Sequence, residues 1–250
     1  MITNKDNSIQ SFSRYEFKYV LSSALAKNIE SEIQHFMDYD GYVHPDMGNK
    51  YIVRSLYFEN RQLTNFNEKV DGIKRRRKYR IRTYSKDKDT LVPVYLEEKG
   101  RVNNRTYKER VEIKYSHLIY FLAMDNSAKL LELYPGNELI EKFAFDSIRK
   151  RLKPTVLIEY IRGPYVNKYG LLFRLTFDSD IKAQLSTELF NKDKQNYWKL
   201  AKPGYTVLEV KFERSIPPWF HRIIQCYNLK RVSISKMVIG MEACGVAKDV

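Results

Sequence analysis

The alternation of apolar and polar residues along the chain predicts many short strands. Side chains two positions apart share a face of a strand, so a period of two marks a strand with one buried face. Short polar loops join several of these segments, which favours antiparallel pairing. The pattern occurs in eight segments: 12–20, 51–58, 73–84, 91–98, 106–114, 155–162, 171–179 and 206–213.

The longer period of an amphipathic helix lies between some of these strands. It predicts helices over 22–36, 61–69, 116–133, 138–151 and 217–227. Helices and strands do not alternate strictly, and no linker or internal repeat marks a boundary. The sequence therefore predicts an α+β protein with a mainly antiparallel sheet, formed by one domain over residues 1–250.

The composition describes a folded, strongly basic chain. Lys and Arg number 44 against 30 Asp and Glu, a net charge of +14, and 43% of the residues are hydrophobic, too many for a disordered basic tail. Cys226 and Cys244 have neither disulfide-framework nor metal-ligand spacing, which favours a reducing compartment. No apolar run approaches the ~18 residues of a membrane span. We expect a soluble, cytoplasmic protein.

The segment at 73–84 carries a row of cations on one face. Its other face carries Ile73, Tyr79 and Ile81, which can pack on a core, while Arg75 and Arg77 fall at the end expected to be solvated. A solvent-exposed basic edge strand would give the same pattern, so this row alone decides nothing. The cations of the row are Lys74, Arg76, Lys78, Arg80 and Arg82.

Other strands place acids and bases together on one face. Open sheets would turn these charged faces to water, whereas a closed barrel with helices outside would turn them into one lumen. Many bases with a minority of acids suit a phosphate chain that arrives with a divalent cation. Phosphoryl transfer then requires no nucleophilic side chain. The mixed positions are Glu16 and Lys18, Glu97 and Lys99, Glu209 and Lys211, Arg174 and Asp178, and Lys108, Arg110 and Glu112.

Common nucleotide and metal motifs are absent from the sequence: it contains no Walker A loop, no Gly-x-Gly-x-x-Gly and no His-Glu-x-x-His. A series of short motifs nevertheless resembles, in order and spacing, the VTC domain of polyphosphate polymerases. That family lies within the triphosphate tunnel metalloenzymes and is related to the CYTH triphosphatases. The motifs are Arg14–Tyr19, Tyr57–Phe58, Arg80–Arg82, Leu96–Lys99, Tyr160–Arg162, Arg174–Asp178, Val207–Lys211 and Ser235–Lys236.

The resemblance implies a closed antiparallel β-barrel with helices packed outside. Its lumen would bind ATP with Mn²⁺ or Mg²⁺ and transfer the γ-phosphoryl group onto a growing polyphosphate chain. The implied catalytic residues are Arg80, Arg82, Lys99 and Arg162; the substrate-binding residues are Lys18, Arg174, Lys211 and Lys236; the metal ligand is Glu209, supported by Glu16, Glu97 and Asp178.

The chain departs from the eukaryotic pattern at Ser233, where a second tunnel lysine is expected and for which Arg231 is a candidate substitute. The SPX and membrane domains fused to eukaryotic members are missing from these residues, so inositol phosphate sensing and translocation are not expected. Two alternatives stay open: a CYTH-type triphosphatase for inorganic or thiamine triphosphate, and a non-catalytic binder of polyphosphate or RNA. Carboxylates interleaved with the bases disfavour a nucleic acid partner.

Overall fold

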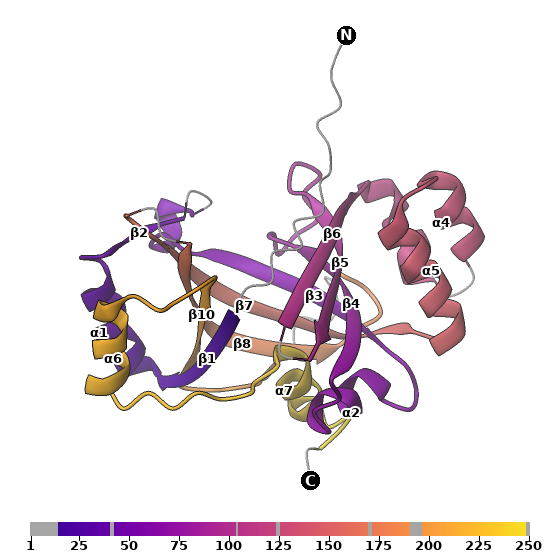
Figure 1. Ribbon diagram of the computed structural model, residues 1–250. Coiled ribbons are helices and arrows are strands. Elements are labelled where there is room, and N and C mark those ends of the chain that lie inside the picture. Colours follow the sequence, from indigo (N-terminus) through magenta and orange to yellow (C-terminus); the bar gives the residue numbers. More distant parts are fainter. Residues whose placement is uncertain are drawn as a thin grey trace.

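The computed structural model describes residues 15–40, 43–103, 105–123, 126–169, 172–190 and 197–248 (Figure 1). Its strands are β1 (Tyr15–Ser22), β2 (Met37–Tyr39), β3 (Tyr51–Glu59), β4 (Arg75–Thr83), β5 (Val94–Val102), β6 (Arg105–Ile113), β7 (Lys153–Asn167), β8 (Phe173–Leu185), β9 (Lys199–Leu200) and β10 (Tyr205–Phe212). Its helices are α1 (Ser23–Ile33), η1 (Pro45–Met47), α2 (Thr64–Val70), η2 (Tyr115–His117), α3 (Leu118–Leu122), α4 (Ser127–Leu133), α5 (Glu138–Lys150), α6 (Pro218–Cys226) and α7 (Lys236–Ala243). In the described ranges, no helix has the length and apolar character needed to cross a membrane.

The strands form one antiparallel sheet in the order β1-β10-β8-β7-β3-β4-β5-β6, with β2 added to β7 and β9 to β8. The predicted class, α+β with a large antiparallel sheet, is confirmed. Each predicted strand has a counterpart, although residues 12–14 and 171 lie outside the described residues. β2 and β9 are too short to show an alternating pattern, and the sequence did not predict them.

The two edge strands of this order, β1 and β6, approach within 8 Å between Cα atoms, but no ladder joins them in the described residues. The predicted closure of the barrel is therefore not confirmed. The chain around 231–232 covers the free edge of β1 instead: Arg231 bridges to Tyr19, and the Val232 amide donates to the Lys18 carbonyl at 2.8 Å.

Two groups of helices cover the outer face of the sheet (Figure 1). α1 and α6 pack on β1, β8 and β10. The Ser22 hydroxyl caps α1 by accepting from the Leu25 amide at 3.2 Å, and Ala26, Ile29 and Ile33 form its buried face at helical spacing.

The second group, α3 to α5, covers the outer face of β3, β4 and β5. Asn137 caps α5, and Phe143 packs edge-on against Phe58 and Tyr79. The helix predicted over 116–133 is divided into η2, α3 and α4, and residues 124 and 125 of it lie outside the described residues.

The last helix, α7, lies on the inner face of the sheet, in contrast to the predicted arrangement with helices only outside. Met237 and Met241 pack with Ile158 and Ala183, and the close approach requires Gly240, where a Cβ would lie 2.9 Å from Ile158 Cδ1. The interior is therefore apolar and filled at this end.

A bulge in β8 separates this apolar interior from a charged one. Ile161 pairs with Ser179 and Glu159 with Lys182, so β8 has one residue more than β7 between these pairs. Asp180, in the bulge, has a positive φ of 51°. The extra residue places both Asp178 and Ile181 on the inner face, which a regular strand could not do.

Candidate functional site

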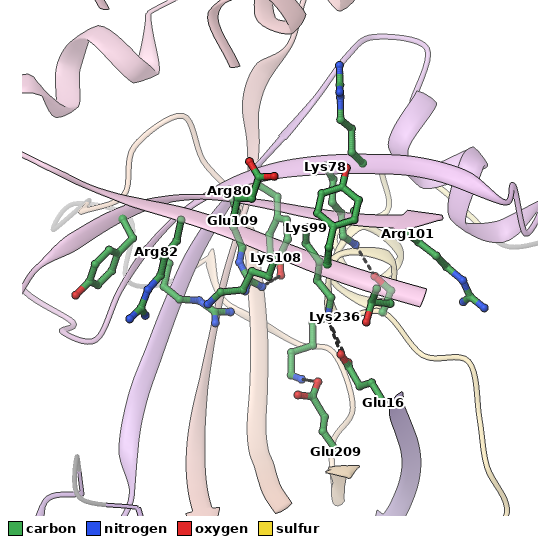
Figure 2. A pocket seen from close by; sticks show the side chains of 18 of the residues that line it. Glu16, Lys78, Arg80, Arg82, Lys99, Arg101, Lys108, Glu109, Glu209 and Lys236 are labelled. Carbon is green, nitrogen blue, oxygen red and sulfur yellow. Dashed lines mark hydrogen bonds and ion pairs between the residues drawn. The ribbon is translucent and has the colours of Figure 1, made fainter. Parts of the chain in front are cut away.

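The charged part of the interior is a cavity of about 1530 Å³ (Figure 2). It is bounded by the inner faces of the strands, by α2 and by the chain from 231 to 236. Sixteen Lys and Arg side chains line it against six Asp and Glu. The chain carries a net charge of +14, so most of its excess positive charge gathers in this cavity.

The alternation in β4 explains how one strand contributes so many cations. Arg80 and Arg82 face the cavity together with Lys78, while Tyr79 and Ile81 are buried under α5. The predicted two-residue period is thus observed. Arg77 differs from the prediction of a solvated end: its Nε donates to the buried Asp146 of α5 at 2.7 Å, an ion pair that ties β4 to the helix.

Glu97 of β5 pairs with Arg80 and Arg82 of β4 and holds their side chains in place. Its Oε2 accepts from Arg80 Nε at 2.7 Å and lies 3.7 Å from Arg82 Nε, and its Oε1 accepts from Lys108 at 2.7 Å. Glu97 is completely buried and does not line the cavity. Burial acts to raise its pKa, but Arg80, Arg82 and Lys108 outweigh burial and hold the pKa well below its usual range.

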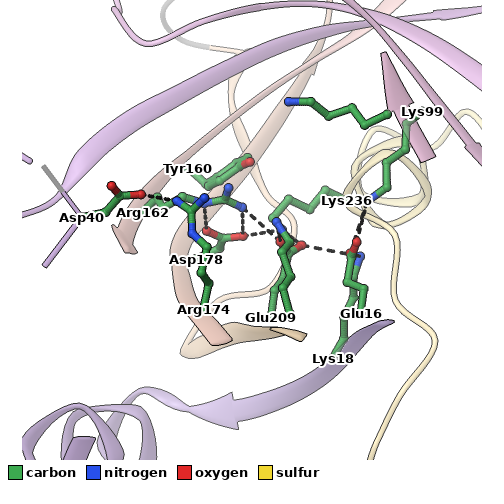
Figure 3. Close-up of polar contacts among 12 residues, drawn as sticks. Glu16, Lys18, Asp40, Lys99, Tyr160, Arg162, Arg174, Asp178, Glu209 and Lys236 are labelled. Atoms are coloured by element: carbon green, nitrogen blue, oxygen red, sulfur yellow. Dashed lines mark hydrogen bonds and ion pairs between the residues drawn. The ribbon is translucent and has the colours of Figure 1, made fainter. Parts of the chain in front are cut away.

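A second cluster joins β7, β8, β10 and α7 (Figure 3). Asp178 receives a bidentate pair from Arg162, with Nε to Oδ1 at 2.6 Å and Nη2 to Oδ2 at 2.7 Å, and lies 2.5 Å from Lys236 Nζ. Glu209 contacts the same two cations, Lys236 at 2.8 Å and Arg162 at 3.2 Å. Asp178 is completely buried, so it holds the cations in place from outside the cavity lining.

Glu16 and Lys18 of β1 extend this network of ion pairs to Glu209 and Lys99. Lys18 Nζ lies 3.1 Å from Glu16 Oε1 and 3.5 Å from Glu209 Oε1. Lys99 of β5 also contacts Glu16, at 3.1 Å, so this ion pair links β1 to β5 across the unpaired edges of β1 and β6. Burial acts to raise the pKa of Glu16, but Lys99 and Lys18 lower it far below the usual carboxyl range.

The described residues contain no group of three or more His, Cys, Asp or Glu side chains placed to hold a metal ion. Glu16 and Glu209, on neighbouring strands, both face the cavity and share the Lys18 ammonium. Mg²⁺ is commonly bound by one or two carboxylates together with substrate phosphates. This pair of hard oxygen donors therefore fits a divalent cation that arrives with a phosphate ligand.

Tyr57 and Lys78 are two cavity groups with strongly shifted pKa values. Burial acts to raise the pKa of Tyr57, but Arg80, Lys78 and Arg82 together lower it to about 7; Arg80 Nη1 donates to its hydroxyl at 2.8 Å. Burial lowers the pKa of Lys78 to about 7 as well. The groups that act on Lys78 are Tyr57 of β3, Lys99 of β5, Lys18 of β1 and Arg80 of β4.

With this geometry in view, the comparisons with known proteins place the chain. The family model of the VTC domain matches residues 13–244. The chain belongs to the VTC domain family. The resemblance read from the motifs is thereby confirmed, and the match includes α7. No curated protein matches the chain.

Two solved structures show a similar fold. One is a Bacillus halodurans protein described as a candidate adenylate cyclase, with a TM-score of 0.52 and 15% identity over 89% of this chain and 95% of that one. The other is a Hippeastrum protein described as a candidate adenylyl cyclase with a dominant triphosphatase activity, with a TM-score of 0.54 and 12% identity over 92% of this chain and 95% of that one. At these identities the likeness concerns the fold.

The VTC-like motifs converge on the cavity, although Arg14, which begins the first motif, lies outside the described residues. Arg174 lies at the margin, where it pairs with Asp40. Glu97 and Asp178 lie behind the lining. The candidates that line the cavity are Glu16, Lys18, Arg80, Arg82, Lys99, Arg162, Arg174, Glu209, Lys211 and Lys236.

Some lining residues were given no role by the sequence reading. Lys78 and Lys108 belong to charged rows that the period of two had identified, so parity could have assigned them to the cavity. Tyr57 and Tyr160 begin two of the motifs that carry the resemblance, but alternation gave them no role, because an inner tyrosine and a core tyrosine follow the same pattern. Their hydroxyls accept from Arg80 and Arg82, respectively.

The departure at Ser233 has a structural counterpart. Lys69 of α2 donates to Ser233 Oγ at 2.8 Å, and both residues line the cavity. Arg231 also lines it, with its guanidinium 4.0 Å from the centre of the Phe17 ring. Cations from α2 and from the preceding residues therefore stand beside the position where a lysine was expected.

Proposed function

We propose that this VTC domain is a polyphosphate polymerase that transfers the γ-phosphoryl group of ATP onto a growing inorganic polyphosphate chain. One observation carries the proposal: sixteen cationic side chains line a single cavity, more positive charge than one triphosphate can neutralise. A polyanionic chain that extends through the cavity accounts for the remainder. Because the excess charge lies inside the cavity, the same observation disfavours an RNA-binding outer surface.

Arg80, Arg82 and Arg162 would bind the triphosphate and stabilise charge on the transferring group. The buried carboxylates Glu97 and Asp178 fix the arginines before substrate arrives, so little reorganisation is needed during the reaction. In this proposal Glu97 and Asp178 are positioning residues. The arrangement differs from the role of metal ligand that the resemblance implied for them.

The remaining lumen residues have complementary roles. Lys18, Lys99, Lys211 and Lys236 would contact phosphate oxygens, while Arg174 would bind phosphate at the margin. Glu16 and Glu209 would hold Mn²⁺ or Mg²⁺, which when bound would neutralise phosphate charge and orient the phosphate oxygens. The acceptor is a terminal phosphate oxygen of the chain, held beside the donor so that transfer is nearly intramolecular. This oxygen would form the new bond to the γ-phosphorus as the bond to the β–γ bridging oxygen of ATP breaks, and ADP would leave.

The test is the fate of γ-labelled ATP incubated with the pure protein and Mn²⁺. The proposal predicts that most of the label enters chains that a polyphosphate-specific exopolyphosphatase degrades. Label found almost entirely in orthophosphate from the earliest times would replace the polymerase with a triphosphatase, the activity described for the Hippeastrum protein of similar fold. Absence of turnover together with tight polyphosphate binding would indicate a non-catalytic binder.

A further inference from the structure

A group of tyrosines lines the cavity at the end away from α7. Lys78 contacts the N-cap of α7, where its ammonium donates to Ser235 Oγ at 3.0 Å, and Arg82 lies at the other end of the same row of cations (Figure 2). Tyr84 directly follows β4 and is the next inner residue after Arg82. The aromatic and apolar residues of this part of the lining are Tyr51, Tyr84, Val92, Pro93 and Tyr95.

The strand register places each tyrosine beside an arginine that the proposed function assigns to the donor phosphates. Tyr51 pairs with Arg162 across β3 and β7, and Tyr95 pairs with Arg82 across β5 and β4. Tyr84 lies two residues beyond Arg82, a rise of ~7 Å along the chain. A nucleotide whose phosphates contact these arginines would therefore have its nucleoside within reach of the tyrosines.

The tyrosine rings meet at steep angles and do not stack on one another. The ring of Tyr84 is central: its centre lies 5.6 Å from that of Tyr51, at 75°, and 6.4 Å from that of Tyr95, at 70°. All three residues are only partly buried. Arg110 of β6 lies over Tyr95, with its guanidinium 4.8 Å from the ring centre. Aromatic rings and the guanidinium plane are the groups on which nucleobases stack.

A phosphate chain does not account for this part of the lining. Phosphate oxygens bind cations and hydrogen-bond donors, which aromatic ring faces and a proline do not supply. Packing accounts for it only in part: Tyr51 and Tyr84 pack against the apolar cluster that includes Val53, yet both rings also line the cavity. The organic part of the donor is the ligand that these side chains suit.

We propose that Tyr84, Tyr95 and Arg110 form a stacking site for the nucleobase of the donor, with Tyr51 at its border. The inference rests on the proposed function and adds two points to it. The site supplies affinity for the nucleoside of ATP that inorganic triphosphate cannot use. It also sets the direction of the donor: with the base at the tyrosines and the phosphates at the arginines, the γ-phosphorus is turned toward α2 and α7.

The experiment is a calorimetric binding titration with three probes: a non-hydrolysable ATP analogue, the matching UTP analogue, and tripolyphosphate, which has the phosphates without a nucleoside. The proteins are the wild type, Tyr84→Leu, Tyr95→Leu and the control Tyr205→Leu, an exposed tyrosine of β10 that does not line the cavity. We expect the Kd for the ATP analogue to rise about tenfold in Tyr84→Leu and in Tyr95→Leu, with the Kd for tripolyphosphate unchanged.

The other two comparisons test the stacking itself. The UTP analogue has a smaller ring to stack, so it should bind the wild type more weakly than the ATP analogue and lose less affinity in the two variants. Tyr205→Leu should bind every probe like the wild type.

Three outcomes would overturn the proposal. Equal losses for the ATP analogue and tripolyphosphate would make the tyrosines part of the phosphate site or of the fold. Unchanged affinity for the ATP analogue in both variants, with unfolding midpoints like the wild type, would leave the base in solvent. Equal affinity of the wild type for the ATP and UTP analogues would exclude purine stacking, and this comparison needs no variant to fold. Because these titrations involve no turnover, failure of polymerase activity in the label assay would refute the proposed function separately.

Discussion

Asp178→Asn is expected to destabilise the protein strongly, because this carboxylate neutralises two buried cations without touching the cavity. Breaking a buried ion pair by removing one partner costs about 3–5 kcal/mol. Glu209 still contacts Arg162 and Lys236 after the change, and asparagine keeps one acceptor oxygen, so we expect the lower end, about 3 kcal/mol. For a chain of this length that corresponds to a fall in Tm of about 6–12 °C.

The assay is urea and thermal unfolding of the wild type and the variant at pH 7. The matched control is Asp180→Asn, an exposed acid two residues away whose positive φ asparagine tolerates; it should change stability by less than about 0.5 kcal/mol. A difference below about 1 kcal/mol between Asp178→Asn and the wild type would refute the reasoning.

Two further measurements separate the electrostatic explanation from a simple packing defect. Tripolyphosphate should stabilise Asp178→Asn more than the wild type, because the variant leaves Arg162 and Lys236 undercompensated. Burial acts to raise the pKa of Asp178, but Arg162 and Lys236 lower it. A lowered pKa means that the carboxylate stabilises the protein above the unfolded value of about 3.9 and loses this contribution as pH falls through the folded value. The stability gap should therefore be constant between about pH 6 and 8 and narrow only in acid.

Three other predictions follow from the cavity. Glu209→Gln should abolish divalent-dependent turnover in protein that is still folded at the assay temperature, since an amide nitrogen cannot replace a carboxylate oxygen on a hard cation; because Glu209 also pairs with Arg162 and Lys236, unfolding curves must accompany the assay, and unchanged activity at saturating Mn²⁺ would remove this residue from the metal site. Arg80→Ala and Arg82→Ala should each weaken ATP binding by about tenfold or more, and Arg75→Ala should not, as calorimetry with the analogue would show; equal losses would contradict the assignment of faces. Since burial lowers the pKa of Lys78 to about 7, wild-type affinity for long polyphosphate should fall as pH rises from 6 to 8; Lys78→Met should weaken that dependence without removing it, because the pKa values of Tyr57 and Lys108 are also lowered to about 7.

The strand faces were predictable because burial and charge obey the same two-residue period. In β4, Arg80 and Arg82 separate from Tyr79 and Ile81 in the sequence as they do in the structure. The resemblance to the VTC domain also implied that Glu16 and Glu209 would face one lumen, although it could not show that Lys18 contacts both of them.

Other features depended on long-range contacts that no local pattern contains. Apolar residues of α7 gave no helix prediction, because α7 is buried on nearly every side and has no polar face. The same limit applies to Glu97 and Asp178. Their parity identified them as inner residues, but only the three-dimensional structure shows that arginines lie between them and the cavity.

The bulge at Asp180 means that one inserted residue decides where the interior of the sheet changes from charged to apolar. Without it, Lys182 and Gln184 would turn inward and Ile181 and Ala183 outward. The apolar residues of α7 would then face polar side chains and lose their packing contacts on β8. On one side of the bulge the inner residues of β8 face the charged cavity, and on the other side they pack against apolar residues of α7. Moving the inserted residue along β8 would shift the boundary between the charged and the apolar part of this interior, with Arg80, Arg82 and Arg162 left where they are.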